Sequence, residues 1–360
     1  MNKLEKARLA INDIDKQMAE LFEKRMKAVE EVVSYKIENN MQVLDSTREK
    51  VLIAKNVSYI EEEKYKESYL DYFHEILRIS KNYQKQIINK DRIGYGGTKG
   101  AFSHIACMKM FPNHKLVSYV TFEEVVKAVE NGDLEYGVIP FENSSTGEVA
   151  ETSDLLRDHN VFIQGIYDLE ITHNLLGVPG AKLSDIKEVY SHPQGFSQCA
   201  LFLKGREFTK ITYPNTAIAA EMVSSKQDKS KAAIASIETA KIFDLDVLVE
   251  HINTSSDNTT RFIVISKDMS EEGTFFQMLF TVKNESGTLA KAMNAIAEYG
   301  FNMRSIKSRA IPNEPWSYYF HVEIEGNLAD ENAKAMIENL KKHCSDVKLL
   351  GAYNKYEGEF

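Results

Sequence analysis

The stretch Asn258-Thr259-Thr260-Arg261-Phe262-Ile263-Val264-Ile265 joins a polar segment directly to an apolar, β-branched run. Such a run is typical of a buried strand, so the two threonines and the arginine are expected where that strand begins. Ligands of open α/β sheets bind beside strand ends, which makes this segment a candidate binding site. An ordinary turn before a core strand would give the same pattern. The interpretation therefore depends on further polar segments elsewhere in the chain.

Composition indicates a folded, acidic protein and excludes several classes of function. The chain has 360 residues, of which 43% are hydrophobic and 27% charged, as is typical of two or three globular domains. A net charge of −9 argues against a nucleic-acid binder that relies on phosphate contacts. The three cysteines, Cys107, Cys199 and Cys344, lie far apart and show no metal-ligand spacing. We therefore expect packed thiols in a reducing compartment and no metal site.

The N-terminus and the apolar runs predict a cytoplasmic protein. Residues 1–6 lack the apolar core of a secretion signal, and no run of 18 apolar residues is present. We therefore expect neither export nor attachment to a membrane.

Residues 1–88 are expected to form an all-helical domain. From Leu4 to about Lys36 no proline or glycine interrupts a stripe of apolar residues with the 3.6-residue period of a helix. At about 1.5 Å per residue this helix would be roughly 50 Å long, too long for a small domain to bury alone. The same helix of a second chain is the expected partner.

Three cationic residues lie within this stripe or in phase with it. Arg8 is in phase with Leu4, and Arg25 and Lys36 are in phase with Val29. Burial of a cation is costly unless an anion compensates it, so these positions indicate an anionic ligand. The alternative is that the long side chains extend along the edge of the stripe into water.

Two further helices contribute neutral and acidic groups. The segment Ser46-Thr47-Arg48-Glu49 has the spacing of a capping box and begins a helix that runs through Val57. A third helix is expected from about Glu63 to Ile88, with Ser80 and Gln84 one turn apart on its inner face. Such a pocket suits a small polyanion and contains no nucleophile paired with a base. Its chemistry would therefore be electrostatic and conformational.

The polar pattern of these helices resembles the all-helical chorismate mutase domain. The eight positions that carry the resemblance are Arg8, Arg25, Lys36, Asp45, Arg48, Glu49, Ser80 and Gln84. The resemblance implies an intertwined dimer that rearranges chorismate to prephenate. Such a pericyclic reaction requires a held conformer and hydrogen-bond donors at the ether oxygen, and no covalent step.

The resemblance also implies a role for each position. Arg8 would come from the partner chain, while Arg25, Lys36 and Arg48 would hold the two carboxylates and the ether oxygen. The remaining residues divide into two pairs. Asp45 and Glu49 would contact the substrate hydroxyl, and Ser80 and Gln84 would contact a carboxylate and the ether oxygen.

Residues 92–268 are expected to form an α/β domain, because apolar strands alternate with helices. Polar segments follow several strands: Gly96–His104, Glu142–Gly147 and Ser191–Gln198 each open a helix. One such segment is often a helix cap, but together with the segment at Thr260 there are four at equivalent strand ends, which favours a small-molecule cleft. The chain returns near Asn253, which predicts two lobes with the ligand between them.

The glycine-rich turn after the first strand does not match a nucleotide-binding motif. Lys99 stands where the dinucleotide fingerprint requires glycine, and it precedes Gly100, the reverse of the P-loop order. The turn can still hold an anion on backbone N–H groups at the start of a helix. We therefore expect no cofactor.

These segments resemble the motifs of prephenate dehydratases. The matching motifs are Gly100-Ala101-Phe102-Ser103-His104, Glu142-Asn143-Ser144-x-x-Gly147, Ser191-His192-Pro193-Gln194 with Gln198, and Thr260-Arg261-Phe262. Their order after a mutase domain is similar to the family of bifunctional chorismate mutase–prephenate dehydratases. The resemblance implies a two-lobed fold like that of periplasmic binding proteins. It implies a reaction in which prephenate loses CO₂ and water to give phenylpyruvate.

The roles implied in this cleft centre on Thr260, which would donate a hydrogen bond to the departing hydroxyl. The residues expected to bind substrate are Asn143, Ser144, Ser191, Gln198 and Arg261. Arg261 would either hold the retained carboxylate or brace the loop. His104 and His192 are expected to have structural roles in their turns.

Residues 274–360 are expected to form an α+β domain with the ferredoxin-like order βαββαβ. The segment resembles an ACT domain, which implies feedback binding of phenylalanine at a dimer interface. The residues expected to take part are Gly287, Leu289, Ser308 and Arg309. Lys307 and Ala310 stand where the family has glutamate and proline. A dimerisation domain that no longer binds a ligand is the alternative.

The expected partners are chorismate, prephenate, phenylalanine as effector, and at least one further copy of the chain in a homodimer or tetramer. Two alternatives to the bifunctional enzyme stay open. One is a non-catalytic regulator that binds an aromatic amino acid. The other is a mutase–prephenate dehydrogenase fusion, which the missing dinucleotide fingerprint disfavours.

Overall fold

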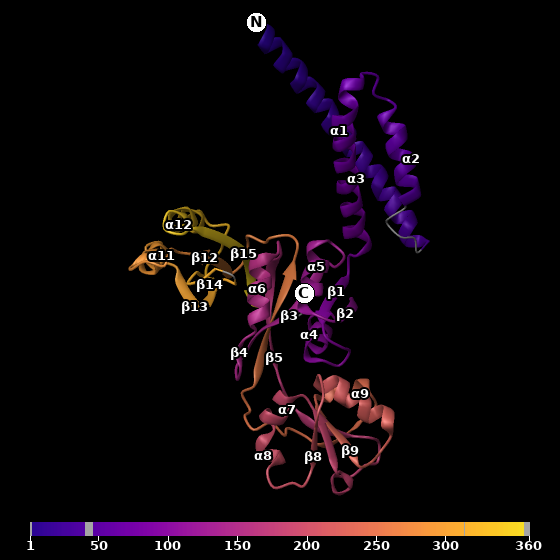
Figure 1. The fold of residues 1–360 in the computed structure, drawn as a ribbon, viewed down its shortest axis with the longest axis vertical. Coiled ribbons are helices and arrows are strands. Elements are labelled where there is room, and N and C mark those ends of the chain that lie inside the picture. The colour runs from indigo at the N-terminus through magenta and orange to yellow at the C-terminus, as the bar shows by residue number, and fades with distance from the viewer. Residues whose placement is uncertain (1, 40–45, 313, 356–360) are drawn as a thin grey trace. The chain divides into compact units, whose positions relative to one another are not determined.

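The computed structural model describes residues 2–39, 46–312 and 314–355 (Figure 1). The chain divides into two compact units, residues 1–90 and 91–360. Within the described residues, no helix combines the length and apolarity that crossing a membrane would require.

The described residues of the first unit form three α-helices and one short 3₁₀ turn. Its elements are α1 (Lys3–Glu38), α2 (Ser46–Val57), η1 (Glu63–Tyr65) and α3 (Lys66–Ile88). A capping box between Asn2 and Glu5 begins α1, because each side chain accepts a hydrogen bond from the other residue's backbone N–H. The predicted helices are confirmed, and both α1 and α2 pack against α3.

The second unit contains two sheets. The five-stranded sheet has the order β10-β6-β9-β7-β8, and the ten-stranded sheet has the order β13-β14-β12-β15-β5-β11-β3-β1-β2, with β4 paired to β3. The strands of the first lobe are β1 (Arg92–Gly96), β2 (Lys115–Tyr119), β3 (Tyr136–Asn143), β4 (Gly147–Glu148), β5 (Phe162–Glu170) and β11 (Thr259–Ser266). Its helices are α4 (Phe102–Met110), α5 (Phe122–Glu130) and α6 (Ala150–Asp158).

The second lobe is inserted between β5 and β11. Its strands are β6 (Asn174–Gly177), β7 (Glu188–Ser191), β8 (Thr209–Thr212), β9 (Lys231–Ala235) and β10 (Asp246–Val249). Its helices are η2 (Leu183–Asp185), α7 (Pro193–Gln198), α8 (Ala200–Leu203), α9 (Thr216–Lys226) and α10 (Ile237–Ile242). The two-lobed arrangement agrees with the prediction, because the chain leaves the first sheet after β5 and returns to it with β11.

The strand β11 forms because its apolar residues are covered on both faces. Phe262, Ile263, Val264 and Ile265 are each at most 1% exposed. The strand pairs antiparallel with β3 on one side and β5 on the other. A β-branched run of this kind is typical of such an interior strand.

The C-terminal residues have the predicted order of elements. These are β12 (Phe275–Thr281), α11 (Thr288–Ala297), β13 (Asn302–Ala310), β14 (Tyr318–Glu325), α12 (Glu331–Lys341) and β15 (Asp346–Lys355). The last strand extends to Lys355, because Asn354 and Lys355 pair in parallel with Gly165 and Ile166 of β5. This pairing joins the C-terminal sheet to the sheet of the first lobe.

The two sheets also share a hydrophobic core. Leu279, Tyr319 and Leu350 of the C-terminal sheet belong to the same buried cluster as Leu155 and Leu156 of α6. The opposite face of the C-terminal sheet packs against α11 and α12 in a separate cluster. The sheet is therefore buried on both faces, and one face contacts the first lobe.

We predict that Ile263→Ala lowers the free energy of unfolding by about 2–5 kcal/mol, because it leaves a cavity in the middle of β11. Chemical denaturation followed by circular dichroism measures this change. The matched control is Val120→Ala, at a valine that is 85% exposed, which should change stability by no more than about 0.5 kcal/mol. Equal effects of the two substitutions would contradict the assignment of β11 to the core.

Candidate functional site

Four of the eight predicted mutase residues lie together between α1 and α3. Arg25 on α1 donates a hydrogen bond to the Ser80 hydroxyl, and Lys36 Nζ donates to Gln84 Oε1 over 2.9 Å. Ser80 is 3% exposed and Gln84 is 9% exposed. Burial lowers the pKa of Arg25 from its ordinary value, although arginine stays charged at neutral pH. The helix interface therefore carries two cations beside two buried neutral groups.

Of the other mutase positions, Arg48 and Glu49 lie on α2, and Arg8 lies near the start of α1. Glu49 on α2 forms an ion pair with Lys81 at 2.9 Å, and Arg48 is exposed at the start of the same helix. Asp45 lies outside the described residues. Arg8 is exposed and precedes Arg25 by 17 residues on the same helix, which corresponds to about 25 Å along its axis. One chain cannot bring both arginines to one small ligand.

The N-terminal half of α1 presents large apolar side chains to solvent. Seven of them are at least 42% exposed: Leu4, Leu9, Ile11, Ile14, Met18, Leu21 and Phe22. Among the described residues of α1, Val33 alone is buried. Contiguous exposed apolar surface of this kind marks an interaction site.

A cavity of about 360 Å³ lies between the two lobes of the second unit. Its lining comes from the ends of β3 and β11, from the segment after β5, and from the starts of α4, α7 and α9. The polar residues that line it are Ser103, Asn143, Thr146, His173, His192, Gln194, Gln198, Asn215, Thr216 and Thr260. Its volume lies within the range of small-molecule sites. Three predicted residues, Asn143, Gln198 and Thr260, therefore meet in one cavity.

The side-chain amide of Asn143 connects the polar groups of this cavity. Its Nδ2 donates to Thr260 Oγ1 and to Asn258 Oδ1, both over 2.9 Å. Its Oδ1 accepts from the backbone N–H groups of Ser145 at 3.0 Å and Thr146 at 3.1 Å. The amide is thus fixed at both ends. Because Thr260 Oγ1 accepts from Asn143, the threonine keeps its own hydrogen available for a ligand.

The backbone places these two side chains on one face of the sheet. Thr260 and Asn143 are direct partners across the antiparallel pair of β11 and β3. A register shift follows between Arg261 and Phe262. The extra residue is Phe141 of β3, so Pro140 and Asn143, three positions apart, both line the cavity, while Thr260 and Phe262 line it by the regular alternation of β11.

Gln198 and His173 form a second hydrogen-bonded pair in the cavity. The Oε1 atom of Gln198, at the end of α7, lies 2.8 Å from the Nε2 atom of His173. His173 is 1% exposed, and burial lowers its pKa, so the imidazole is neutral at neutral pH. The sequence analysis missed His173. Its position where the chain crosses from β5 to the second lobe could have indicated that it lies near the cavity.

Three predicted substrate contacts lie elsewhere. Ser191 is fully buried and donates to the Ile234 carbonyl oxygen over 3.3 Å, so it does not line the cavity. Ser144 lines a neighbouring cavity of about 420 Å³, where its hydroxyl donates to the Asp257 carbonyl oxygen. Arg261 points to the other face of β11 and pairs with both oxygens of Asp168 at 2.8 and 3.2 Å. Of the two roles expected for Arg261, its position fits the brace.

The two histidines expected to be structural occupy turns. His104 accepts from the backbone N–H of Gly100 through Nδ1 at 3.2 Å. His192 caps α7, where its Nδ1 accepts from the Gln194 N–H.

The predicted effector residues do not share one face of β13. Ser308 is exposed, whereas the neighbouring Arg309 faces the first lobe and pairs with Asp154 of α6 at 2.8 Å. Successive side chains of a strand point to opposite faces, which explains the separation. Gly287 is exposed before α11, and Leu289 packs against the core beneath that helix.

Comparison with known proteins identifies both units. A family model of chorismate mutase type II matches residues 7–85, and one of prephenate dehydratase matches residues 93–270. The bifunctional chorismate mutase/prephenate dehydratase of Buchnera aphidicola subsp. Acyrthosiphon pisum (strain APS) is 33% identical over 362 residues. That alignment covers 95% of this chain and 94% of the relative. The matched family is a dehydratase, so the alternative of a prephenate dehydrogenase fusion is wrong.

Two solved structures share the fold of most of the chain. The prephenate dehydratase of Staphylococcus aureus subsp. aureus Mu50 has a TM-score of 0.65 and 29% identity, covering 73% of this chain and 100% of that chain. The prephenate dehydratase of Arthrobacter aurescens, solved in complex with L-Phe, has a TM-score of 0.68 and 24% identity, covering 73% and 90%. The chain therefore belongs to the family of bifunctional chorismate mutase/prephenate dehydratases and carries both enzyme activities.

Proposed function

We propose that the helical unit rearranges chorismate to prephenate at the Arg25–Lys36–Ser80–Gln84 cluster, and that the cleft around Thr260 converts prephenate to phenylpyruvate. The observation that carries the proposal is the fixed hydrogen bond from Asn143 to Thr260 inside a cavity of suitable size. Phenylpyruvate formation from chorismate by the purified protein, without added cofactor, tests both steps together.

The mutase cluster supplies what a pericyclic reaction of a dianion requires. Arg25 and Lys36 offer positive charge for carboxylates, in a partly buried setting where charge interactions are strong. Lys36 holds Gln84 by its carbonyl oxygen, which leaves the amide NH₂ group as a donor. That donor is suited to the ether oxygen, which gains negative charge as the C–O bond breaks.

The pocket becomes complete when a second chain joins. Arg8 is about 25 Å from Arg25 along α1, so its contribution to a shared ligand must come from another protomer. The exposed apolar face of the same half-helix provides the surface on which that protomer packs. A homodimer is therefore the proposed minimal active form for the first step.

We predict that Arg8→Ala and Gln84→Ala each lower mutase kcat about 10²-fold or more, because each removes a group that stabilises developing charge. Mixing the two variants after unfolding and refolding should restore about a quarter of the wild-type rate. Half of the random dimers then contain one intact pocket, built from Gln84 of one chain and Arg8 of the other. Failure of the mixture to regain activity, with dimers verified by gel filtration, would show that Arg8 acts within its own chain.

The dehydratase step removes a carboxylate and a hydroxyl from the same ring. The C–C bond to the carboxylate breaks, its electron pair enters the ring, and the C–O bond breaks as hydroxide leaves and is protonated to water. Aromatisation drives the reaction, so the protein must stabilise the departing oxygen. The hydroxyl of Thr260 is the proposed donor, since Asn143 occupies its acceptor side.

We predict that Thr260→Val lowers dehydratase kcat about 10²-fold to 10³-fold, the usual cost of losing one donor to a developing oxyanion. Mutase activity, measured in the same sample, should stay unchanged and serves as the folding control. Thr260→Ser retains the hydroxyl and should keep most of the rate. A dehydratase rate for Thr260→Val within a few-fold of wild type would remove Thr260 from the mechanism.

The C-terminal residues are proposed to act as an ACT domain that senses phenylalanine. The βαββαβ order supports this proposal, as do the family residues Leu289, Ser308 and Arg309. Lys307 of β13 forms an ion pair with Glu142 at 2.9 Å, and its ammonium lies 5.0 Å from the centre of the Phe141 ring. Glu142 immediately precedes Asn143 on β3. A shift of β13 on ligand binding would therefore act on the strand that carries the cleft's central amide.

We predict that phenylalanine inhibits the wild-type dehydratase and that Lys307→Met weakens this inhibition about fivefold or more, a typical allosteric coupling. The rate without phenylalanine should change little, because Lys307 does not line the cavity. Lys334→Ala, at an exposed lysine of α12, is the matched control. If phenylalanine inhibits Lys307→Met as strongly as the wild type, the Lys307–Glu142 ion pair does not transmit the inhibition. If calorimetry detects no heat at millimolar phenylalanine, the C-terminal residues do not bind this effector.

A further inference from the structure

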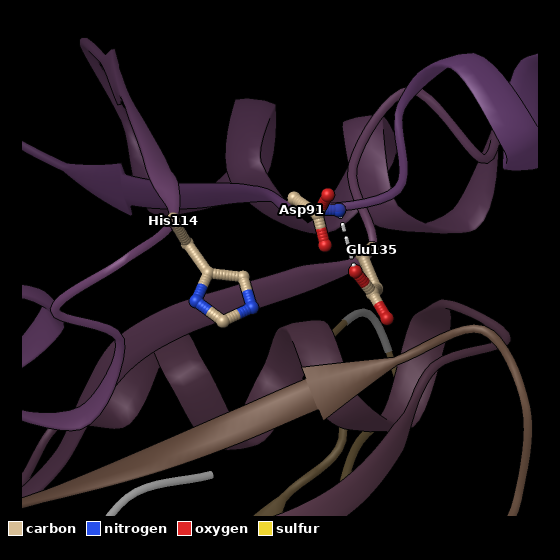
Figure 2. A group of neighbouring side chains, drawn as sticks. All are labelled: Asp91, His114 and Glu135. Carbon is tan, nitrogen blue, oxygen red and sulfur yellow. Dashed lines mark hydrogen bonds between the residues drawn. The ribbon is translucent and has the colours of Figure 1, made fainter.

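Three side chains that commonly bind metal ions lie together at the edge of the first lobe's sheet. They are Asp91, His114 and Glu135, and one ligand atom from each lies within 4.8 Å of the others. Figure 2 shows one ring nitrogen of His114 pointing toward the two carboxylate side chains. The sequence analysis found no metal-ligand spacing, because these residues are more than 20 positions apart.

The sheet itself enforces this convergence. Asp91, His114 and Glu135 each immediately precede a strand, respectively β1, β2 and β3. Both neighbouring strands pair in parallel with β1, so the three strand starts meet at one edge. Backbone hydrogen bonds extend the pairing to the cluster: the Lys115 N–H donates to Asp91 O at 2.9 Å, and the Glu135 N–H donates to Arg92 O at 3.0 Å.

Neighbouring groups hold Glu135 and His114 in place, but the three side chains do not provide one another with hydrogen-bond partners. Glu135 Oε2 accepts from the backbone N–H of Asp91 at 2.7 Å, as Figure 2 shows. The ring of His114 packs against the edge of Phe111 with centroids 5.4 Å apart. Among the described residues, neither the Asp91 carboxylate nor either ring nitrogen of His114 has a hydrogen-bond or ion-pair partner. The nitrogen that faces the carboxylates is Nε2, whereas the buried Nδ1 atom lies on the opposite side of the ring.

This arrangement is electrostatically incomplete. Two carboxylates and a nitrogen lone pair that point toward one another repel unless a proton or a cation lies between them. The protein supplies three donors of types N, O and O, held at one place by strand pairing.

We propose that Asp91, His114 and Glu135 bind a divalent transition-metal ion, for which Zn²⁺ fits best. Zinc accepts imidazole nitrogen and carboxylate oxygen at about 2.0–2.2 Å and uses four ligands, so water would complete the set. Mg²⁺ and Ca²⁺ prefer oxygen ligands in larger number. The two carboxylates neutralise the charge of the ion. The exposed side chain of Asp91 can rotate to shorten the donor separations.

The proposed ion has a structural role, separate from both reactions. Asn143 and the turn after β1 line the cleft from the carboxyl ends of their strands, whereas the cluster lies at the amino ends. Lys90 ends the helical unit, so Asp91 is the first residue of the second unit. A metal ion would tie the start of β1 to β2 and β3 at this junction.

The test is zinc binding by the full-length protein after dialysis against a chelator. Calorimetric titration with ZnCl₂ should give one ion per chain in the wild type. His114→Gln and Asp91→Asn should each weaken binding about tenfold or more, while His74→Gln, at an exposed histidine of α3, should not. Zinc should raise the thermal midpoint of the wild type and leave that of His114→Gln unchanged. Co²⁺ in place of Zn²⁺ should give visible absorption bands that Asp91→Asn removes.

Two results would overturn the proposal. One is absence of zinc uptake by the wild type. The other is wild-type affinity in both His114→Gln and Asp91→Asn, which would assign the ion to another site. Asp91 is exposed, so its variant decides the question if His114→Gln fails to fold.

Discussion

Burial of Phe262–Ile265 on both faces of a sheet is the constraint on which the second unit depends. The run comes last in the first lobe's sequence yet lies between β3 and β5, so the whole second lobe separates it in sequence from its partner β5. Its polar start is then held beside the end of β3. That junction brings Thr260 to Asn143, and it lies where the two lobes meet around the cavity. Core formation and site formation are therefore one event.

The same strands present a second set of polar groups to their other face. Arg261 and Glu142 follow or precede the cleft residues by one position, so the pleat of the sheet directs them away from the cavity. There Arg261 pairs with Asp168, and Glu142 pairs with Lys307 of β13. The proposed catalytic and regulatory surfaces are thus the two faces of one pair of strands, which gives the proposed regulation a short route.

In the helical unit, helix periodicity rather than strand pairing positions the polar residues. Its cations and neutral groups are brought together by helix periodicity, and Ser80 and Gln84 are buried against α1 within one chain. The N-terminal half of α1 instead exposes a row of apolar side chains and carries Arg8 far from Arg25. A long helix cannot bury its whole stripe against two shorter ones. Its apolar stripe is therefore left partly exposed in a single chain, in contrast to the second unit, whose core closes on itself.

The sequence by itself determined the local features of this protein. The 3.6-residue stripe gave the long helices, and the apolar run after Thr260 gave the buried strand, because periodicity and side-chain type act over a few residues. Polar segments at strand ends also predicted that Asn143, Gln198 and Thr260 share a cavity. The tertiary structure decided which face each strand residue occupies, so it buried Ser191 and paired Arg261 with Asp168 and Arg309 with Asp154. It also decided the pairing of β15 with β5 and the meeting of Asp91, His114 and Glu135. These contacts join residues far apart in the chain, and strand register, which no local pattern encodes, sets them.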